Sequence, residues 1–293
     1  MFRIISLLFC ALFISTSSLQ AQFFLPPLSP KASLTQMVGN TIIKVEYSRA
    51  IARGRTIFGG LIPYDKPWQT SASEVIISFD EPVIIDKQRL PAGKYALITI
   101  PGEKEWTIII HDANHGILEY GKSEIRIQTC VPVTKAGRHY EALSFDFDIS
   151  DNNARLYISW TDVQVSFPIS TGINEQITTY IDSIISAPLM GDGHEYFKPI
   201  NYLLFNQQQP DKALALIARF QEVDKGEYPY RMLMRAYTQL GQKDKALKAA
   251  DKGIEAVKRE YAHQPERISS LLKSYEEQRA MITAGTTNGQ KSW

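Results

Sequence analysis

The stretch ALSFDFDISDNNARLYISW, residues 142–160, decides the fold class of this chain. From Leu143 to Ile149, apolar side chains alternate strictly with Ser or Asp, so one face is apolar and the other is polar. This period of two is typical of a half-buried strand in an antiparallel sheet. The residues that follow, Asp151–Asn153, tolerate left-handed backbone and favour a tight turn. The stretch therefore predicts two antiparallel strands joined by a short turn.

The same pattern extends outward over residues 23–170. The expected strands are Leu34–Val38, Ile42–Tyr47, Val75–Phe79, Val83–Ile85, Tyr95–Ile100, Trp106–His111, Glu124–Val131, Ala142–Ile149, Ala154–Trp160 and Val163–Ile169. No helical pattern interrupts these short runs. Many short strands with short turns predict an antiparallel β-sandwich or a jelly-roll-like barrel.

From Thr171 to about Ala280 the apolar period becomes helical. The expected helices are Ile173–Ile185, Glu195–Asn206, Asp211–Val223, Pro229–Leu240, Lys243–Tyr261 and Pro265–Ile282.

An internal echo lies within this region, because Asp211–Leu214 and Asp244–Leu247 both read Asp-Lys-Ala-Leu. Their spacing is close to the 34-residue period of tetratricopeptide repeats, whose second helix packs through a small residue. A helical bundle with a chance echo is the alternative.

We therefore expect an α+β chain in two segregated domains, a β-sandwich or jelly-roll-like domain followed by a small all-α, tetratricopeptide-like domain. The expected boundaries are 1–21 for a signal peptide, 22–170 for the β domain, 171–285 for the helical region and 286–293 for a flexible tail.

The N-terminus has the pattern of an export signal. Arg3 precedes the apolar run Ile4–Ile14, and a polar stretch ends at the loose small-residue motif Leu19–Ala21. The apolar run is too short for a comfortable membrane span. We expect cleavage near Ala21 and Gln22, and a periplasmic or secreted mature chain without a transmembrane segment. A retained anchor helix is the alternative.

The mature chain has no net charge and a single cysteine. Removing residues 1–21 takes away one cation and no acid, which leaves 31 of the 32 Lys and Arg residues against 31 Asp and Glu residues. Nucleic-acid binding needs a basic excess or a clustered basic face, so we expect no nucleic-acid partner. Cys130 cannot form an intramolecular disulfide, and its place in an alternating run predicts a small buried residue.

Several long motifs between Ser29 and Ile169 are shared with one known family. They are Ser29-Pro30 with Ala32, Val45–Arg49, Gly54-Arg55, Ile57–Gly59, Pro63-Tyr64, Trp68, Thr70, Ala72, Glu74, Leu90–Gly93, Tyr95, Ile100–Glu103 and Trp106-Thr107. Through them about half of the chain resembles domain of unknown function 2911, a family of exported proteins from Gram-negative bacteria. Its members often carry a helical, tetratricopeptide-like C-terminal part. The resemblance implies the fold and the compartment. It implies no activity, because none is established for the family.

The chain departs from the family pattern inside these motifs. It has Ala50 where the family usually has Pro, and Gln69 and Ser73 where the family usually has Arg and Asn. If the family shares a ligand site there, this member's version is altered.

The long connection Glu46–Glu74, EYSRAIARGRTIFGGLIPYDKPWQTSASE, is the candidate ligand-binding region. Connections in compact domains are usually about 4–6 residues long, and longer ones are commonly functional or disordered. Arginine suits carboxylate, phosphate or sulfate, while flat aromatic faces suit sugar rings or Pro-rich peptide. The candidate binding residues are Tyr47, Arg49, Arg55, Tyr64, Trp68 and Glu74.

Two other interpretations of this segment stay open. In one it is an internal brace, in which Trp68 plugs the core edge and Arg49 or Arg55 pairs with Glu74. In the other Glu74 is the acid or base of a carbohydrate-active or other hydrolytic enzyme, beside Trp68 and Arg55. The sequence carries no reaction signature, so a non-enzymatic binding module is favoured and no catalytic residue is assigned.

We expect no metal and no cofactor. His111 and His115 are four residues apart, but at a strand end this spacing does not put both on one face. The expected partners are a protein bound by the helical-repeat region and a glycan or peptide bound by Glu46–Glu74.

Overall fold

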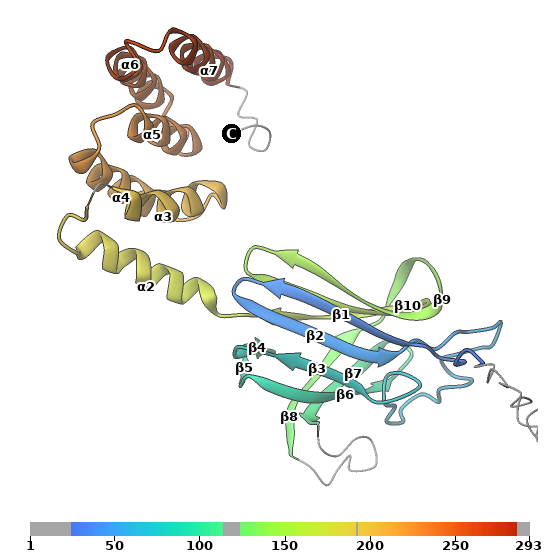
Figure 1. Cartoon of the computed structure of the whole chain (residues 1–293). Coiled ribbons are helices and arrows are strands. Elements are labelled where there is room, and N and C mark those ends of the chain that lie inside the picture. The colour runs from blue at the N-terminus through green and yellow to red at the C-terminus, as the bar shows by residue number, and fades with distance from the viewer. Residues whose placement is uncertain (1–24, 114–123, 192, 286–293) are drawn as a thin grey trace, which may run out of the picture. The chain divides into compact units, whose positions relative to one another are not determined.

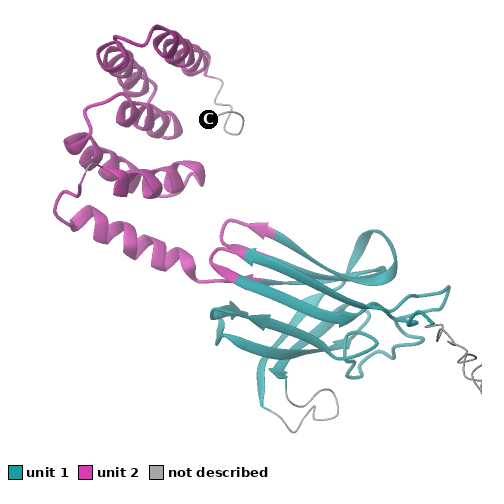
Figure 2. Ribbon diagram, in the orientation of Figure 1, with its two compact units in different colours: residues 1–37, 42–148, 155–168 teal, residues 38–41, 149–154, 169–293 magenta. Residues whose placement is uncertain are grey.

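A computed structural model describes residues 25–113, 124–191 and 193–285 (Figure 1). The chain divides into two compact units, coloured separately in Figure 2. Within the described ranges the first unit comprises residues up to 37, 42–148 and 155–168, and the second comprises residues 38–41, 149–154 and 169 onward. The predicted signal peptide lies outside the described residues. No helix within the described ranges is both long enough and apolar enough to cross a membrane.

The first unit is built on two antiparallel sheets, as the alternation predicts. The six-stranded sheet has the order β1 (Lys31–Val38), β2 (Thr41–Ser48), β3 (Val75–Phe79), β6 (Gly93–Pro101), β7 (Glu105–Asp112), β8 (Ile125–Pro132). The four-stranded sheet has the order β5 (Gln88–Leu90), β4 (Val83–Ile85), β10 (Asn153–Ser170), β9 (Thr134–Ser150). The β-sandwich-like fold class is confirmed.

The core of the first unit lies between the two sheets, because side chains from both sheets meet there. Tyr47 of β2 and Phe145 of β9 have ring centroids 4.6 Å apart. Strand β3 alternates buried and half-buried residues, whereas Tyr95–Thr99 in the middle of β6 is buried throughout. A strand that is covered on both faces loses its alternation and reads as a continuous apolar run.

The structure corrects two details of the predicted strands. The runs Ala154–Trp160 and Val163–Ile169 belong to the single strand β10, in which Thr161 has a positive φ of 54° instead of turning the chain. Strand β5 was not expected. It pairs with β4 through the two-residue turn Asp86-Lys87, where both φ angles are positive. Such turns favour Asn-Gly or Asp-Gly, so Asp-Lys gave a weak signal.

Two side chains also differ from expectation. Cys130 is exposed, because Ile127 and Val131 set the buried phase of β8 and Cys130 has the opposite phase. Ile149 is 43% exposed, although it continues the apolar face of Leu143 and Phe145. Alternation predicts which face a residue occupies, but the face of Ile149 is no longer covered near the end of β9.

The second unit contains the six helices that the period predicts, with bounds within a few residues. They are α2 (Ile173–Ser186), α3 (His194–Phe205), α4 (Pro210–Val223), α5 (Tyr228–Gln239), α6 (Lys243–Glu260) and α7 (Pro265–Ala284). Helix α3 packs on α4, α5 packs on α6, and α7 packs on α6. Ala213 and Ala246 of the internal echo occupy matching positions near the starts of α4 and α6, and both are fully buried.

Helices α6 and α7 approach closely at a glycine. A Cβ atom built on Gly253 of α6 would lie 2.5 Å from the Cε1 and Cζ atoms of the Tyr275 ring in α7. Gly253 and Tyr275 are both buried. The absence of a side chain on Gly253 therefore makes room for the tyrosine.

Candidate functional site

The predicted binding segment, Glu46–Glu74, is fixed to both sheets of the first unit. Ala50 accepts a backbone hydrogen bond of 2.8 Å from Leu143 of β9, and Ala52 donates one of 2.7 Å to Glu141. Further along, Trp68 exchanges two backbone hydrogen bonds with Thr99 of β6, at 2.8 and 2.9 Å. The connection begins and ends in the six-stranded sheet, since β2 and β3 are neighbours there, and between these ends it pairs with β9 of the other sheet.

Trp68 lies in a buried aromatic cluster and presents no open face. It is 8% exposed and stacks on Trp160 with a centroid distance of 6.0 Å and an interplanar angle of 20°. Trp106 meets Trp68 edge-on at 6.0 Å, and Phe58 packs against all three indoles. Since Trp106 comes from β7 and Trp160 from β10, Trp68 packs between residues of both sheets, as the brace interpretation expects.

The arginines do not pair with Glu74, so that part of the brace interpretation is wrong. Arg49 donates to the hydroxyl of Ser144 at 2.8 Å. Arg55 donates from Nε to the carbonyl of Ala52 at 2.9 Å and from Nη2 to the carbonyl of Ile51 at 2.7 Å. The guanidinium of Arg55 thus satisfies backbone acceptors of its own loop, which lie three and four residues before it.

Tyr64 has a local packing role. The ring covers Gly59, where a built Cβ would lie 2.7 Å from Cε2, and Gly59 has a positive φ of 78°. Tyr64 remains partly exposed.

Tyr47 and Glu74 are the two predicted site residues that share a hollow. It has a volume of about 460 Å³ and is lined by Lys31, Ala32, Ser33, Glu46, Tyr47, Ser48, Ser73, Glu74 and Ile76, from and beside β1, β2 and β3. The Oε1 atom of Glu74 is buried and has no hydrogen-bond partner within the described part of the chain. The hydroxyls of Ser48 and Ser73 bond to each other at 2.6 Å.

The six predicted residues therefore do not form one site. Trp68 and Arg55 are absent from the lining of the hollow that holds Glu74. A hydrolase that uses Glu74 stays a prediction, without the neighbours that the sequence proposed for it.

The ranges that the structure describes contain no candidate metal-binding site. No group of three or more His, Cys, Asp and Glu side chains gathers there as metal ligands would. His111 is buried in β7, and His115 lies outside the described residues.

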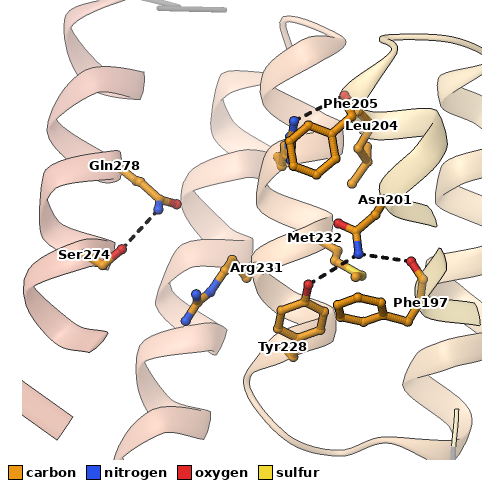
Figure 3. A pocket seen from close by; sticks show the side chains of 10 residues that line it. Phe197, Asn201, Leu204, Phe205, Tyr228, Arg231, Met232, Ser274 and Gln278 are labelled. Atoms are coloured by element: carbon orange, nitrogen blue, oxygen red, sulfur yellow. Dashed lines mark hydrogen bonds between the residues drawn. The ribbon is translucent and has the colours of Figure 1, made fainter. Parts of the chain in front are cut away.

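The second unit holds a groove of about 530 Å³ between α3, α5 and α7 (Figure 3). It is lined by Phe197, Asn201, Leu204 and Phe205 of α3, Tyr228, Arg231, Met232 and Arg235 of α5, and Ser274 and Gln278 of α7. Helices α4 and α6, which lie between these three in chain order, contribute no lining residue. Every second helix thus faces the groove.

The groove combines a buried apolar base with exposed aromatic rings. Leu204 and Met232 are nearly fully buried, whereas Phe197 is 40% exposed and Phe205 is 59% exposed. Phe197 stacks on Tyr228 with centroids 5.0 Å apart, and the amide of Asn201 donates to the Phe197 carbonyl at 3.0 Å (Figure 3). Exposed apolar side chains gathered in one concave place are typical of an interaction site.

Arg231 is held by the buried carboxylate of Glu227. Its Nη2 atom lies 2.8 Å from Oε1 of Glu227, whose side chain is 7% exposed. The hydroxyl of Tyr275 donates to the other oxygen of Glu227 at 3.0 Å. Burial of the phenol and the nearby charge of Glu227 raise the pKa of Tyr275. This network fixes the guanidinium of Arg231 in one orientation.

Arg235 lies one helical turn after Arg231. Its guanidinium is 4.2 Å above the ring of Phe205, and Nη2 donates to the Leu204 carbonyl at 3.4 Å. Burial lowers the pKa of Arg235 from its ordinary value, because the charged form is partly removed from water. An arginine still keeps its charge at neutral pH.

Sequence reasoning missed every residue of this groove. The signal was present in α5, where Tyr228, Arg231 and Arg235 recur at spacings of three and four and so share one helix face. The partners from α3 and α7 could not be found in this way, because they are brought together only by packing.

Comparison with protein families matches residues 29–169 to the family described as "Protein of unknown function (DUF2911)". No curated protein and no solved structure matches the chain. The matched segment covers the strands of the first unit and ends before α2.

Proposed function

We propose, from the features of the second unit, that this chain is a non-enzymatic binding protein. Residues 29–169 belong to the DUF2911 family, which carries no assigned function. The groove between α3, α5 and α7 holds a segment of another polypeptide. The observation that carries this proposal is the exposure of Phe197 and Phe205 beside a buried apolar base. Closing a partner over these rings would remove apolar surface from water, which favours association.

In this proposal the first unit is a stable folded domain with a structural role. Its long connection is fastened to both sheets, and Trp68 is buried rather than offered to a ligand. The hollow beside Glu74 remains the candidate place for a glycan or small polar ligand on this unit.

Photo-crosslinking from the groove tests the binding role in cells that make the full chain. A photoreactive phenylalanine analogue replaces Phe205, which is exposed and lines the groove. The matched control carries the same analogue at Lys252, an exposed position of α6 outside the lining. We expect a discrete crosslinked protein from position 205 and none from position 252. Equal crosslinking from both positions, or none from position 205, contradicts the proposal.

We also propose that the chain works in the periplasm or is secreted. The support is the charged, apolar and small-residue pattern of residues 1–21. Removal of that segment lowers the mass by about 2.3 kDa, taking about 110 Da per residue for a signal peptide of this length. Intact-mass spectrometry of the cell-derived protein should show a mature N-terminus near Gln22. A chain that retains Met1 rules out cleavage.

A further inference from the structure

The hollow beside Glu74 in the first unit holds a carboxylate without a partner. Within residues 25–113, 124–191 and 193–285, no hydrogen bond or ion pair reaches this carboxylate, and its Oε1 atom is buried. Oε2 is not buried in this way, so it is the oxygen that a ligand could reach. Partial removal of a charge from water costs free energy unless an opposite charge or a donor compensates for it. Glu74 therefore lacks a donor on its buried side and on its open side.

Glu46, the other acid of the hollow, is already paired. Lys44 lies 2.8 Å from its Oε1 atom. The hydrogen bond from Lys44 lowers the pKa of Glu46, and the charges of Lys94 and Lys31 act in the same direction. Lys31, the cation of the lining, forms no ion pair with Glu74 in the part of the chain that the structure describes. The carboxylate that remains for a guest is that of Glu74.

The hollow also offers a hydroxyl acceptor and an apolar wall. Ser48 and Ser73 share one O–H···O bond of 2.6 Å, and a hydroxyl oxygen has two lone pairs, so each oxygen can still accept a hydrogen bond. Ser73 is exposed, whereas Ser48 is buried. The apolar wall consists of Ala32 and Ile76, which are half-buried and line the same hollow. A volume of about 460 Å³ is enough for a small organic molecule.

We propose that this hollow binds a small organic molecule by its primary ammonium group, which pairs with Glu74 and donates to Ser73, while the carbon chain packs on the apolar wall. The inference concerns the first unit and does not depend on the groove of the second. An ammonium is a compact charge with three N–H donors, so it can meet Oε2 and a neighbouring hydroxyl together. The planar fork of a guanidinium pairs best with both oxygens of a carboxylate, and here Oε1 is buried.

A metal ion or a glycan fits this lining less well. Ca²⁺ takes about six to eight oxygen ligands, and the carboxylates of the lining are Glu46 and Glu74, of which Glu46 is paired with Lys44. A sugar ring favours an open aromatic face. Tyr47, the aromatic residue of the lining, is 7% exposed and packs on Phe145. A glycan would therefore bind through its hydroxyl groups without a stacking surface.

Titration of the full chain with n-butylammonium tests this chemistry, followed by the amide chemical shifts of the labelled protein in two-dimensional NMR. Butanol is the matched probe, because it has the same carbon chain and no charge. We expect saturable shifts at Ser33, Ser73 and Ile76 with a Kd on the order of millimolar, as suits one charge pair on a very small ligand. Butanol should not produce them. Binding should weaken as salt is raised, because charge pairs are screened.

Matched variants locate the cation. Glu74→Gln should weaken butylammonium binding about tenfold or more, the factor expected for loss of a hydrogen bond to a charged group. Glu81→Gln removes the same charge at an exposed position outside the lining and should leave binding unchanged. Ser73→Ala, also at an exposed position, should weaken binding about threefold and gives a second measurement that does not change the buried carboxylate. Circular dichroism checks that each variant keeps its fold.

The remaining outcomes contradict the proposal in different ways. If no saturable shifts occur at the hollow, or if butanol shifts the same amides equally, the hollow does not select an ammonium. If Glu74→Gln and Glu81→Gln weaken binding equally, the cation is attracted by general surface charge. If binding survives Glu74→Gln and is lost in Glu46→Gln, the partner is Glu46. Tighter binding of n-butylguanidinium than of n-butylammonium would show that both oxygens of Glu74 are open, against the geometry argued above.

Discussion

Replacing Trp68 with Ala should destabilise the first unit by about 3–5 kcal/mol, the usual cost of truncating a large buried aromatic. The indole is 8% exposed and contacts Phe58, Trp106 and Trp160, so its removal leaves a cavity lined by three rings. Rigid neighbours relax poorly into such a space. Urea unfolding followed by near-ultraviolet circular dichroism measures the loss, because Trp106 and Trp160 remain as reporters of this unit.

Leu61→Ala is the matched control for this substitution. Leu61 belongs to the same connection but is 46% exposed, so its truncation should change stability by less than about 1 kcal/mol. If Trp68→Ala also stays within that range, Trp68 is a surface residue in solution and the brace interpretation fails.

Replacing Gly253 with Ala should destabilise the second unit by about 1–3 kcal/mol, the usual range for overpacking a core. Helix propensity alone predicts the opposite sign, since Ala is about 0.8–1.0 kcal/mol better than Gly within a helix. The added methyl group would overlap the ring of Tyr275, which is itself 1% exposed and bonded to Glu227. Urea unfolding followed by the helical circular-dichroism signal gives the free energy of unfolding.

A double-mutant cycle identifies the cause of that loss. In a Tyr275→Leu background the ring is gone, so Gly253→Ala should cost less than it does in the natural chain. Gly137→Ala serves as a neutral reference, because a Cβ at Gly137 would meet nothing within 4 Å. A stabilising effect of Gly253→Ala would show that α6 and α7 do not pack at this contact.

The fold could be predicted from sequence wherever one periodicity ran uninterrupted. The alternation in Val75–Phe79 and the helical period in Lys243–Tyr261 predicted the bounds of β3 and α6 to within about one residue. The errors came from single backbone conformations. Thr161 adopts a positive φ inside a continuous strand, and Asp86-Lys87 makes a tight turn without the expected glycine. Neither conformation is dictated by the local residue types.

The candidate site could be predicted only in part, because side-chain partners depend on distant packing. The length and composition of Glu46–Glu74 make it stand out in the sequence, but they do not show that Arg55 bonds to carbonyls of its own loop or that Trp68 is covered by strands far away in the sequence. Glu74 and Tyr47 line a hollow whose lining includes neither Trp68 nor Arg55. The groove residues come from α3, α5 and α7, so no local pattern could unite them.

The backbone pairing of residues 50–52 with β9 also bears on aggregation. Strand β9 is at the end of its sheet, and an uncovered edge offers unpaired N–H and C=O groups on which another chain could assemble. Ala50 and Ala52 occupy such groups at Leu143 and Glu141, midway along this 17-residue strand. A template for intermolecular β-pairing needs a long continuous edge. By pairing with the edge at its centre, the connection leaves no uninterrupted edge along β9, which disfavours fibril-like self-association through this strand.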